Sequence, residues 1–220
     1  MSRINEMERN FEYMKTTRRV HIILALTLSL ALCLSGCNLL ASDITQLKSA
    51  TQGLDMVVSS YDQDGNKIDR IRGVSVDISP DSQFAITDSE GKTVEKSAVL
   101  NLTVGGHEMV HVGSTLIAYD STLEDLIDVF AQTVDIENFD RSTPFINRLV
   151  HSLENLTTGK SMLILVRSQS GAPIATFAGN SVSYFSTGID KSTSLLIDGK
   201  PLFIYRSDYT IYELALLRDE

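Results

Sequence analysis

The chain has 220 residues, 28 of them acidic and 19 basic, and a formal net charge of −9 at pH 7. An acidic surface repels nucleic acid and anionic lipid headgroups, so we expect no nucleic-acid partner. The acidic residues are spread along the chain. This distribution favours a solvated surface, with a cation site as the minor alternative.

The first 37 residues have the three parts of a secretory signal peptide. A basic cluster ends at Arg19, an apolar run covers Val20–Leu32, and small residues lead to Cys37. The ending Leu34–Cys37 (Leu-Ser-Gly-Cys) resembles a bacterial lipoprotein signal, in which the cysteine thiol receives a diacylglycerol and becomes the new N-terminus. The resemblance implies a signal peptide over residues 1–36 and a lipid on Cys37. This lipid would hold the protein at the cell membrane, facing the extracytoplasmic side.

An uncleaved transmembrane helix is the alternative for the same segment. The thirteen residues Val20–Leu32 span about 20 Å as a helix, whereas the hydrocarbon core of a bilayer is about 30 Å thick. A helix extended to Leu40 reaches that length, so the small pair Ser35-Gly36 before Cys37 decides in favour of a lipoprotein. Both cysteines of the chain lie in this segment, so we expect no disulfide in the exported domain.

The 183 residues after the signal cysteine (220 − 37) are enough for one domain with a hydrophobic core or for two small lobes. Residues 37–53 are mostly polar and are interpreted as a lipidated tether. Over residues 54–120, short apolar runs alternate with turn residues, which predicts a first antiparallel β-lobe. The same pattern returns over residues 160–217 and predicts a second lobe.

Two helices are predicted in the connection, residues 121–159. The first is expected to begin at Ser121, because Ser121 and Glu124 have capping-box spacing and apolar residues recur behind them at helical intervals. The second begins at Pro144, with proline in its first turn, and Gly159 ends it. The fold class expected from this order is mostly β (α+β), with a helical pair joining two β-lobes.

An internal repeat relates the two β-rich segments. Met56–Ile78 aligns without gaps on Met162–Tyr184 at a shift of 106 residues, and seven of 23 positions are identical. Val104–Val110 aligns more loosely on Ile197–Phe203 at a shift of 93. Chance similarity between β-hairpins is the alternative, but matching glycines and isoleucines in one register favour a duplication. We therefore expect two related antiparallel lobes.

The chain also resembles a known family in four short stretches, Tyr61–Lys67, Glu108–Thr115, Thr143–Leu149 and Ile197–Lys200. These stretches resemble a family of small Gram-positive lipoproteins catalogued only as domain of unknown function 5052. The similarity covers most of residues 45–217. It implies the architecture above and no activity, cofactor or catalytic residue.

The segment His107-Glu108-Met109-Val110-His111 matches the H-E-x-x-H motif. In zinc peptidases this motif lies on a helix, where the two histidines share one face and the glutamate activates a metal-bound water. Here glycines bracket the motif and the repeat aligns it on an apolar segment, so we predict a strand, with the histidines about 13 Å apart. No metal and no catalytic residue is expected, and a zinc-dependent hydrolase using His107, Glu108 and His111 is the alternative.

The acidic segment Asp62–Asp69 resembles a calcium loop, but it lacks a terminal glutamate, and the corresponding repeat copy has no carboxylate. A hairpin turn is therefore predicted there. Together these features predict a lipid-anchored binding or structural module of the cell envelope, with no cofactor and no enzymatic activity. Its partners are expected to be the membrane, through the lipid on Cys37, and an envelope protein or a small ligand.

Overall fold

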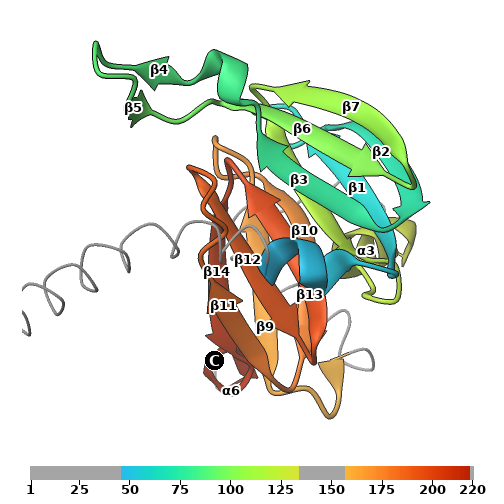
Figure 1. The fold of residues 1–220 in the computed structure, drawn as a ribbon. Coiled ribbons are helices and arrows are strands. Elements are labelled where there is room, and N and C mark those ends of the chain that lie inside the picture. Colours follow the sequence, from blue (N-terminus) through green and yellow to red (C-terminus); the bar gives the residue numbers. More distant parts are fainter. Residues whose placement is uncertain (1–45, 134–156, 219–220) are drawn as a thin grey trace, which may run out of the picture. The chain divides into compact units, whose positions relative to one another are not determined.

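The computed structural model describes residues 46–133 and 157–218, and their secondary structure is mostly β (Figure 1). The mostly β fold class predicted from the sequence is confirmed. The strands are β1 (Asp55–Tyr61), β2 (Lys67–Val74), β3 (Val76–Pro80), β4 (Ile86–Thr87), β5 (Thr93–Glu95), β6 (Val99–Val104), β7 (His107–Val112), β8 (Thr115–Asp120), β9 (Met162–Arg167), β10 (Pro173–Gly179), β11 (Val182–Phe185), β12 (Ser192–Ile197), β13 (Lys200–Tyr205) and β14 (Asp208–Glu213). The helical elements are η1 (Ser82–Phe84), α3 (Leu126–Thr133) and α6 (Ala215–Arg218), and residues 46–51 are also helical.

A six-stranded antiparallel sheet, with strand order β11-β12-β13-β8-β1-β2, lies at the centre of the domain. Its two middle strands come from different segments of the chain, because β8 pairs with β13, placing Tyr119 opposite Leu202. Two three-stranded sheets, β3-β6-β7 and β10-β9-β14, and the small β4-β5 hairpin complete the β structure. The segments 54–120 and 160–217 therefore share one sheet.

Strands β1, β8 and β13 of the six-stranded sheet are buried on both faces. Along β1, Val57 belongs to a core shared with β9 and β10, whereas its neighbour Met56 belongs to a second core shared with β3 and β6. β8 alternates in the same way, with Ile117 in the first core and Leu116 in the second. Burial on both faces explains why these strands are nearly continuous apolar runs in the sequence.

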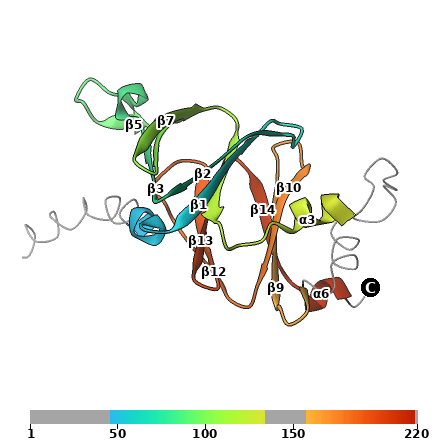
Figure 2. The same ribbon diagram turned by 90° about the vertical axis from the view of Figure 1, so that its right-hand side faces the viewer.

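Further apolar layers lie outside the two cores. Leu126 of α3 and Leu217 of α6 pack with leucines of β9 on the outer face of the β10-β9-β14 sheet. Figure 2 shows the resulting layers: the β3-β6-β7 sheet, the six-stranded sheet, the β10-β9-β14 sheet and the two helices. On the opposite side, Leu47 from the helical residues 46–51 is buried in the second core.

The helix after β8 begins later than the sequence pattern predicts. α3 starts at Leu126, and Asp125, not Ser121, caps it, because Asp125 Oδ1 accepts a hydrogen bond from the Ile127 N–H at 3.1 Å. The same oxygen accepts the Thr176 N–H of β10 at 2.9 Å. The capping-box prediction at Ser121 was wrong, because a contact distant in sequence selects the later cap.

The second predicted helix and most of the tether lie outside the described residues. Thr157 is helical, and the following Gly159 has a φ of +74°, the left-handed conformation common after a helix. Cys37 also lies outside them.

The hairpins of the two β-rich segments have the same register. β1 and β2 pair Met56 with Gly73, and β9 and β10 pair Met162 with Gly179, so both positions differ by 106 residues. The predicted turn glycine of each hairpin has a left-handed backbone, with φ values of +90° at position 65 and +89° at position 171. These values agree with the predicted turns.

The later strands also correspond, at a shift of 93 residues. β6, β7 and β8 begin 93 residues before β12, β13 and β14 (192 − 99, 200 − 107 and 208 − 115). β1 pairs Met56 with Asp120 of β8, and β9 pairs Met162 with Glu213 of β14. The segments differ in one pairing: β8 pairs with β13, whereas the corresponding strands β14 and β7 lie in different sheets.

β2 is one edge of the six-stranded sheet and is exposed along nearly all of its length. Its basic side chains form ion pairs with neighbouring elements. Arg72 pairs with Asp55 of β1, and Asp128 of α3 lies 2.9 Å from Lys67 Nζ and 3.1 Å from an Arg70 guanidinium nitrogen.

Gly179 generates a prediction, because a Cβ at this position would lie 2.5 Å from Cγ2 of the buried Ile197. Gly179→Ala is expected to destabilise the domain by about 1–3 kcal/mol in urea unfolding. Combining it with Ile197→Ala should cost less than the sum of the two single changes, because the second change removes the clashing methyl group. Strict additivity would contradict this contact.

Candidate functional site

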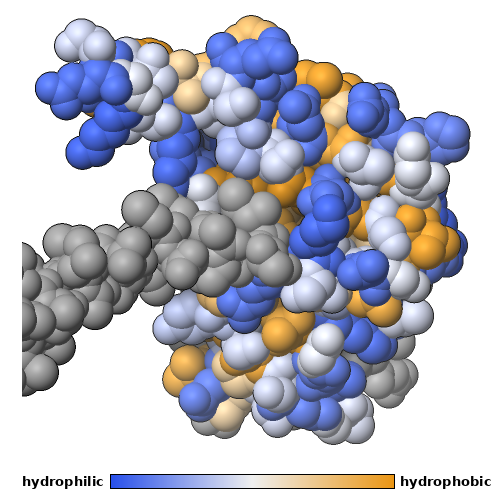
Figure 3. Space-filling model, viewed as in Figure 1, coloured by the Kyte–Doolittle hydropathy of each residue, from blue (hydrophilic) through white to orange (hydrophobic). Residues whose placement is uncertain are grey.

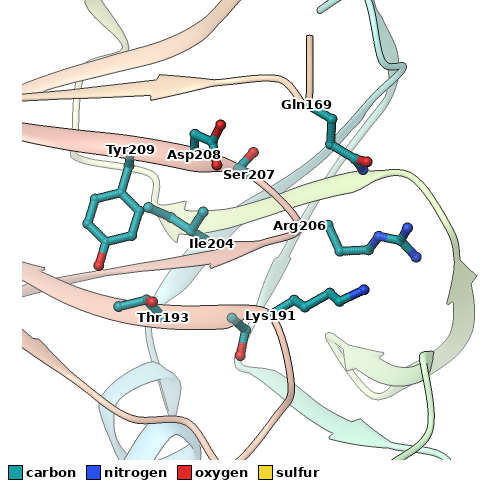
Figure 4. A pocket seen from close by; sticks show the side chains of 9 residues that line it. Gln169, Lys191, Thr193, Ile204, Arg206, Ser207, Asp208 and Tyr209 are labelled. Carbon is teal, nitrogen blue, oxygen red and sulfur yellow. The ribbon is translucent and has the colours of Figure 1, made fainter. Parts of the chain in front are cut away.

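The candidate site is a pocket of about 400 Å³ at one end of β12, β13 and β14 (Figure 4). Its lining includes Lys191 and Thr193 around the start of β12, Ile204 near the end of β13, and Tyr209 near the start of β14. Gln169, from the turn between β9 and β10, completes one wall. The chain passes here from the six-stranded sheet to the β10-β9-β14 sheet, so the pocket lies where the two sheets separate.

Two cationic residues form the pocket's polar end. Lys191 and Arg206 both have left-handed backbones, with φ values of +57° and +53°, and the Arg206 N–H donates to the Lys191 carbonyl oxygen at 2.8 Å. Thr115 Oγ1 donates to the Arg206 carbonyl oxygen at 2.7 Å. These bonds fix the backbone and leave both side chains to project from it.

Neither cationic side chain has an ion-pair or hydrogen-bond partner within residues 46–133 and 157–218. Figure 4 shows Lys191, Arg206 and Gln169 extending on the same side of the pocket, with Tyr209 and Ile204 on the other. The pocket therefore has a cationic end, and its other end combines Tyr209 and Ile204 with the Asp208 carboxylate. Ser207 lies between these two ends in Figure 4, and its Oγ is buried without a hydrogen-bond partner in the described structure.

A second polar group of residues lies inside the domain, beside the start of α3. Asp125 Oδ2, Tyr61 OH, Thr176 Oγ1 and Ser59 Oγ are all buried without a hydrogen-bond partner in the described structure. Asp125 joins two elements through its other oxygen, which accepts the N–H groups of Ile127 and Thr176. Buried polar groups without partners raise the free energy of the folded state.

The pKa of Asp125 is raised to about 7, mainly by burial and also by the nearby carboxylate of Asp128, whereas the backbone N–H donors and Lys67 oppose the shift. Burial also raises the pKa of Tyr119 to about 12, with the carboxylate of Asp125 adding to this effect. The pKa of Tyr61 is raised by the same two causes. Asp125 therefore titrates near neutral pH, while both phenols keep their protons.

This geometry predicts a pH-dependent stability. In the unfolded chain Asp125 has a pKa near 3.8, so between about pH 4 and 7 the folded state binds more protons, and stability falls as the pH rises. Asp125→Asn should remove that loss and leave the variant more stable than the native protein at pH 7.5, by on the order of 3 kcal/mol. Urea unfolding of both proteins at pH 4.5 and 7.5 measures the difference. If the difference in unfolding free energy between the variant and the native protein is the same at both pH values, the titration of Asp125 is contradicted.

The H-E-x-x-H segment is strand β7, as predicted from the sequence. His111 is buried, its Nε2–H donates to the Ser114 carbonyl oxygen at 2.8 Å, and its ring makes an edge contact with Tyr205 at 6.1 Å between centroids. His107 and Glu108 are exposed. Within the described residues, no group of three His, Cys, Asp or Glu side chains lies close enough to hold a metal ion.

The opposite face of β7 is exposed. Val110 and Val112 are each 63% exposed, whereas Met109 packs against the second core. Figure 3 shows apolar side chains interspersed with polar ones on this side of the domain, where β6 and β7 lie at the top of the view. Met109 and His111 thus lie on the more buried face of β7, whereas His107, at the start of the strand, is exposed.

The positions of the two histidines predict different mutational effects. His111→Ala should lower stability by about 1–2 kcal/mol, because it removes a buried ring and its hydrogen bond, whereas His107→Ala should change it by less than about 0.5 kcal/mol. Urea unfolding measures both, and metal analysis of the purified protein provides the control. About one zinc per chain, lost in both variants, would overturn the interpretation of β7 as a structural strand.

The acidic turn after β1 is a hairpin turn, as predicted. Asp62 Oδ1 accepts the N–H groups of Asp64 and Asn66, and Oδ2 accepts from Asn66 Nδ2 at 2.8 Å. Hydrogen bonds from Asn66 hold the pKa of the Asp62 carboxyl below its usual value. The carboxylate is thus occupied within the turn.

The pocket residues were not found from the sequence, because no motif marks them. One signal was available in the sequence: at the alignment shift of 93 residues, Arg206 aligns with Gly113 and Ser207 aligns with Ser114. An arginine at a position that aligns with a turn glycine is unusual.

Comparison with known proteins identifies a family. Residues 18–217 match the model of Domain of unknown function (DUF5052). The chain belongs to this family. No curated protein and no solved structure matches it. Among the described residues, no helix is long and apolar enough to cross a membrane.

Proposed function

We propose that this member of the DUF5052 family is a lipid-anchored, non-enzymatic binding module on the extracytoplasmic side of the cell membrane, with the pocket at β12, β13 and β14 as its ligand site. The observation that carries the proposal is the unpaired polar lining of this pocket. Lys191, Arg206 and Ser207 have no side-chain partners in the described part of the chain, although the pocket is bordered by ordered backbone. Unused hydrogen-bonding capacity in a concave site is typical of ligand binding.

Binding is favoured over catalysis by the kinds of residue that line the pocket. Asp208 is its one carboxylate, and the lining includes neither histidine nor cysteine. Nucleophilic and acid–base catalysis commonly use a nucleophile together with an adjacent base. Within the described residues, no hydrogen bond joins a serine of this lining to Lys191, Asp208 or Tyr209.

The anchor is proposed from the sequence. Leu34–Cys37 supplies the lipoprotein-like ending, and the packed domain follows after a short connection that reaches the helical residues 46–51. Such an arrangement would hold the pocket outside the membrane and within reach of small ligands at the cell surface.

A change at Cys37 tests the anchor. Cys37→Ala should release the protein into the medium or leave an uncleaved precursor, because the thiol that would receive the lipid is absent. Detergent-phase partitioning and mass determination of the variant and the native protein measure this. Unchanged partitioning of a variant that retains residues 20–40 would favour a transmembrane anchor instead.

We also attribute the fold to an internal duplication, in which β1–β3 with β6–β8 correspond to β9–β14. The shared strand order and pairing registers at shifts of 106 and 93 support it. So do the neighbours of two corresponding glycines: a Cβ at Gly73 would lie 2.8 Å from Val104, and one at Gly179 would lie 2.5 Å from Ile197. An experimental structure in which the two sets of strands fail to superpose would remove this attribution.

Blocking the pocket tests the binding function. Thr193 lines the pocket from β12, and Thr193→Trp should fill it and abolish binding of any ligand, whatever its charge. Thermal unfolding of the full chain in detergent, with citrate, glycerol 3-phosphate, N-acetylglucosamine or spermidine added, should show at least one midpoint increase that the variant loses. Equal responses of the variant and the native protein to every compound would contradict a ligand site here.

A further inference from the structure

We infer that the pocket binds a small oxyanion, a carboxylate or phosphate attached to a compact group, through Arg206 and Lys191. The inference rests on the proposed binding function and specifies its ligand. It starts from the backbone of Arg206, which has a φ of +53°. The position that corresponds to it at a shift of 93 residues is Gly113, with a φ of +94°. The turn therefore requires a left-handed residue, and arginine adopts that conformation less readily than glycine.

A second non-glycine residue, Asp198, also aligns with a left-handed glycine, and its side chain has a structural role. Asp198 has a φ of +51° and corresponds to Gly105, at +58°. Its Oδ1 accepts the N–H groups of Asn180 and Ser181 at 2.8 and 2.9 Å, so the aspartate satisfies two backbone donors. Its side chain thus compensates for the unfavourable backbone within the fold.

Arg206 has no such compensation in the described residues. Its N–H and carbonyl groups are bonded, but those bonds would form equally well with glycine, and its guanidinium has no partner there. A side chain that the fold does not use, at a position that disfavours it, points to a partner outside the chain.

Lys191 lies next to Arg206 through the backbone hydrogen bond and also has a left-handed conformation. By the same shift it corresponds to Ala98, whose carbonyl oxygen accepts the Tyr205 hydroxyl at 2.9 Å. In the first segment, therefore, a tyrosine from β13 occupies this region, and in the second it is an open pocket that contains two cations. The corresponding strand pairing, β14 with β7, is the one that the fold does not make.

The rest of the pocket limits the kind of anion. A volume of about 400 Å³ lies near the lower end of the roughly 300–1,000 Å³ range of small-molecule sites. Arg206 can bind a carboxylate or phosphate through two parallel N–H groups, and the Lys191 ammonium can add a second charged donor. Tyr209 and Ile204 line the opposite end and fit a short uncharged portion of the ligand (Figure 4).

Titration calorimetry on the full chain in detergent tests the inference, with glycerol 3-phosphate and citrate as anionic probes and glycerol as the neutral control. Glycerol 3-phosphate or citrate should bind, glycerol should not, and affinity should fall as salt is added. Arg206→Gly and Lys191→Met should each weaken binding by about tenfold or more, because a charge-assisted hydrogen bond is lost. Lys92→Met, a charge removed from an exposed loop far in sequence from the pocket, is the matched control and should bind normally.

Arg206→Gly also separates function from folding. Because glycine suits the left-handed position, this variant should unfold at the same or a higher temperature than the native protein while it loses the anion. Anion binding that survives both Arg206→Gly and Lys191→Met would overturn the inference. A neutral compound could instead bind in a way that Thr193→Trp blocks and Arg206→Gly does not affect. That result would support a ligand site in the pocket but contradict an anionic ligand. A preference for one probe decides between phosphate and carboxylate.

Discussion

The pairing of β8 with β13 is the interaction on which the rest of the structure depends. It joins strands from two segments of the chain in one sheet, with Leu116, Ile117 and Ala118 buried opposite residues of β13. Each face of that sheet then forms one wall of a hydrophobic core. Without this pairing, the backbone N–H and C=O groups on the facing edges of both strands would be buried without partners, which is costly in an apolar interior.

The same pairing makes the two halves of the fold unequal. Only β8 and β13 meet, whereas β14 and β7 belong to separate sheets. Tyr205 of β13 donates to the Ala98 carbonyl oxygen of the first half and occupies the space beside it. The second half keeps that space as the pocket with Lys191 and Arg206. Under the proposed duplication, one of two corresponding surfaces is thus used for packing and the other is left open as the pocket.

The sequence predicted features that depend on near neighbours. It predicted the mostly β class, the turns at Gly65 and Gly171, and the strand over His107–Val112, because alternation and turn residues determine them locally. It did not predict the β8–β13 pairing, since strands buried on both faces carry no pattern that identifies their neighbour. It placed a helix cap at Ser121, where a contact between Asp125 and β10 determines the result. The pocket was missed because its residues converge only in three dimensions.

The ion pairs along β2 bear on how copies of the protein can coexist. An edge strand offers unpaired backbone groups that a second molecule can extend into a continuous sheet. Along β2, Arg72 is held by Asp55, and Lys67 and Arg70 by Asp128, so charged side chains border the open edge. A neighbouring strand that docked there would have to displace these pairs or strip their water. If the proposed lipid anchor confines the molecules to a membrane surface, this charged border would oppose such strand-to-strand association.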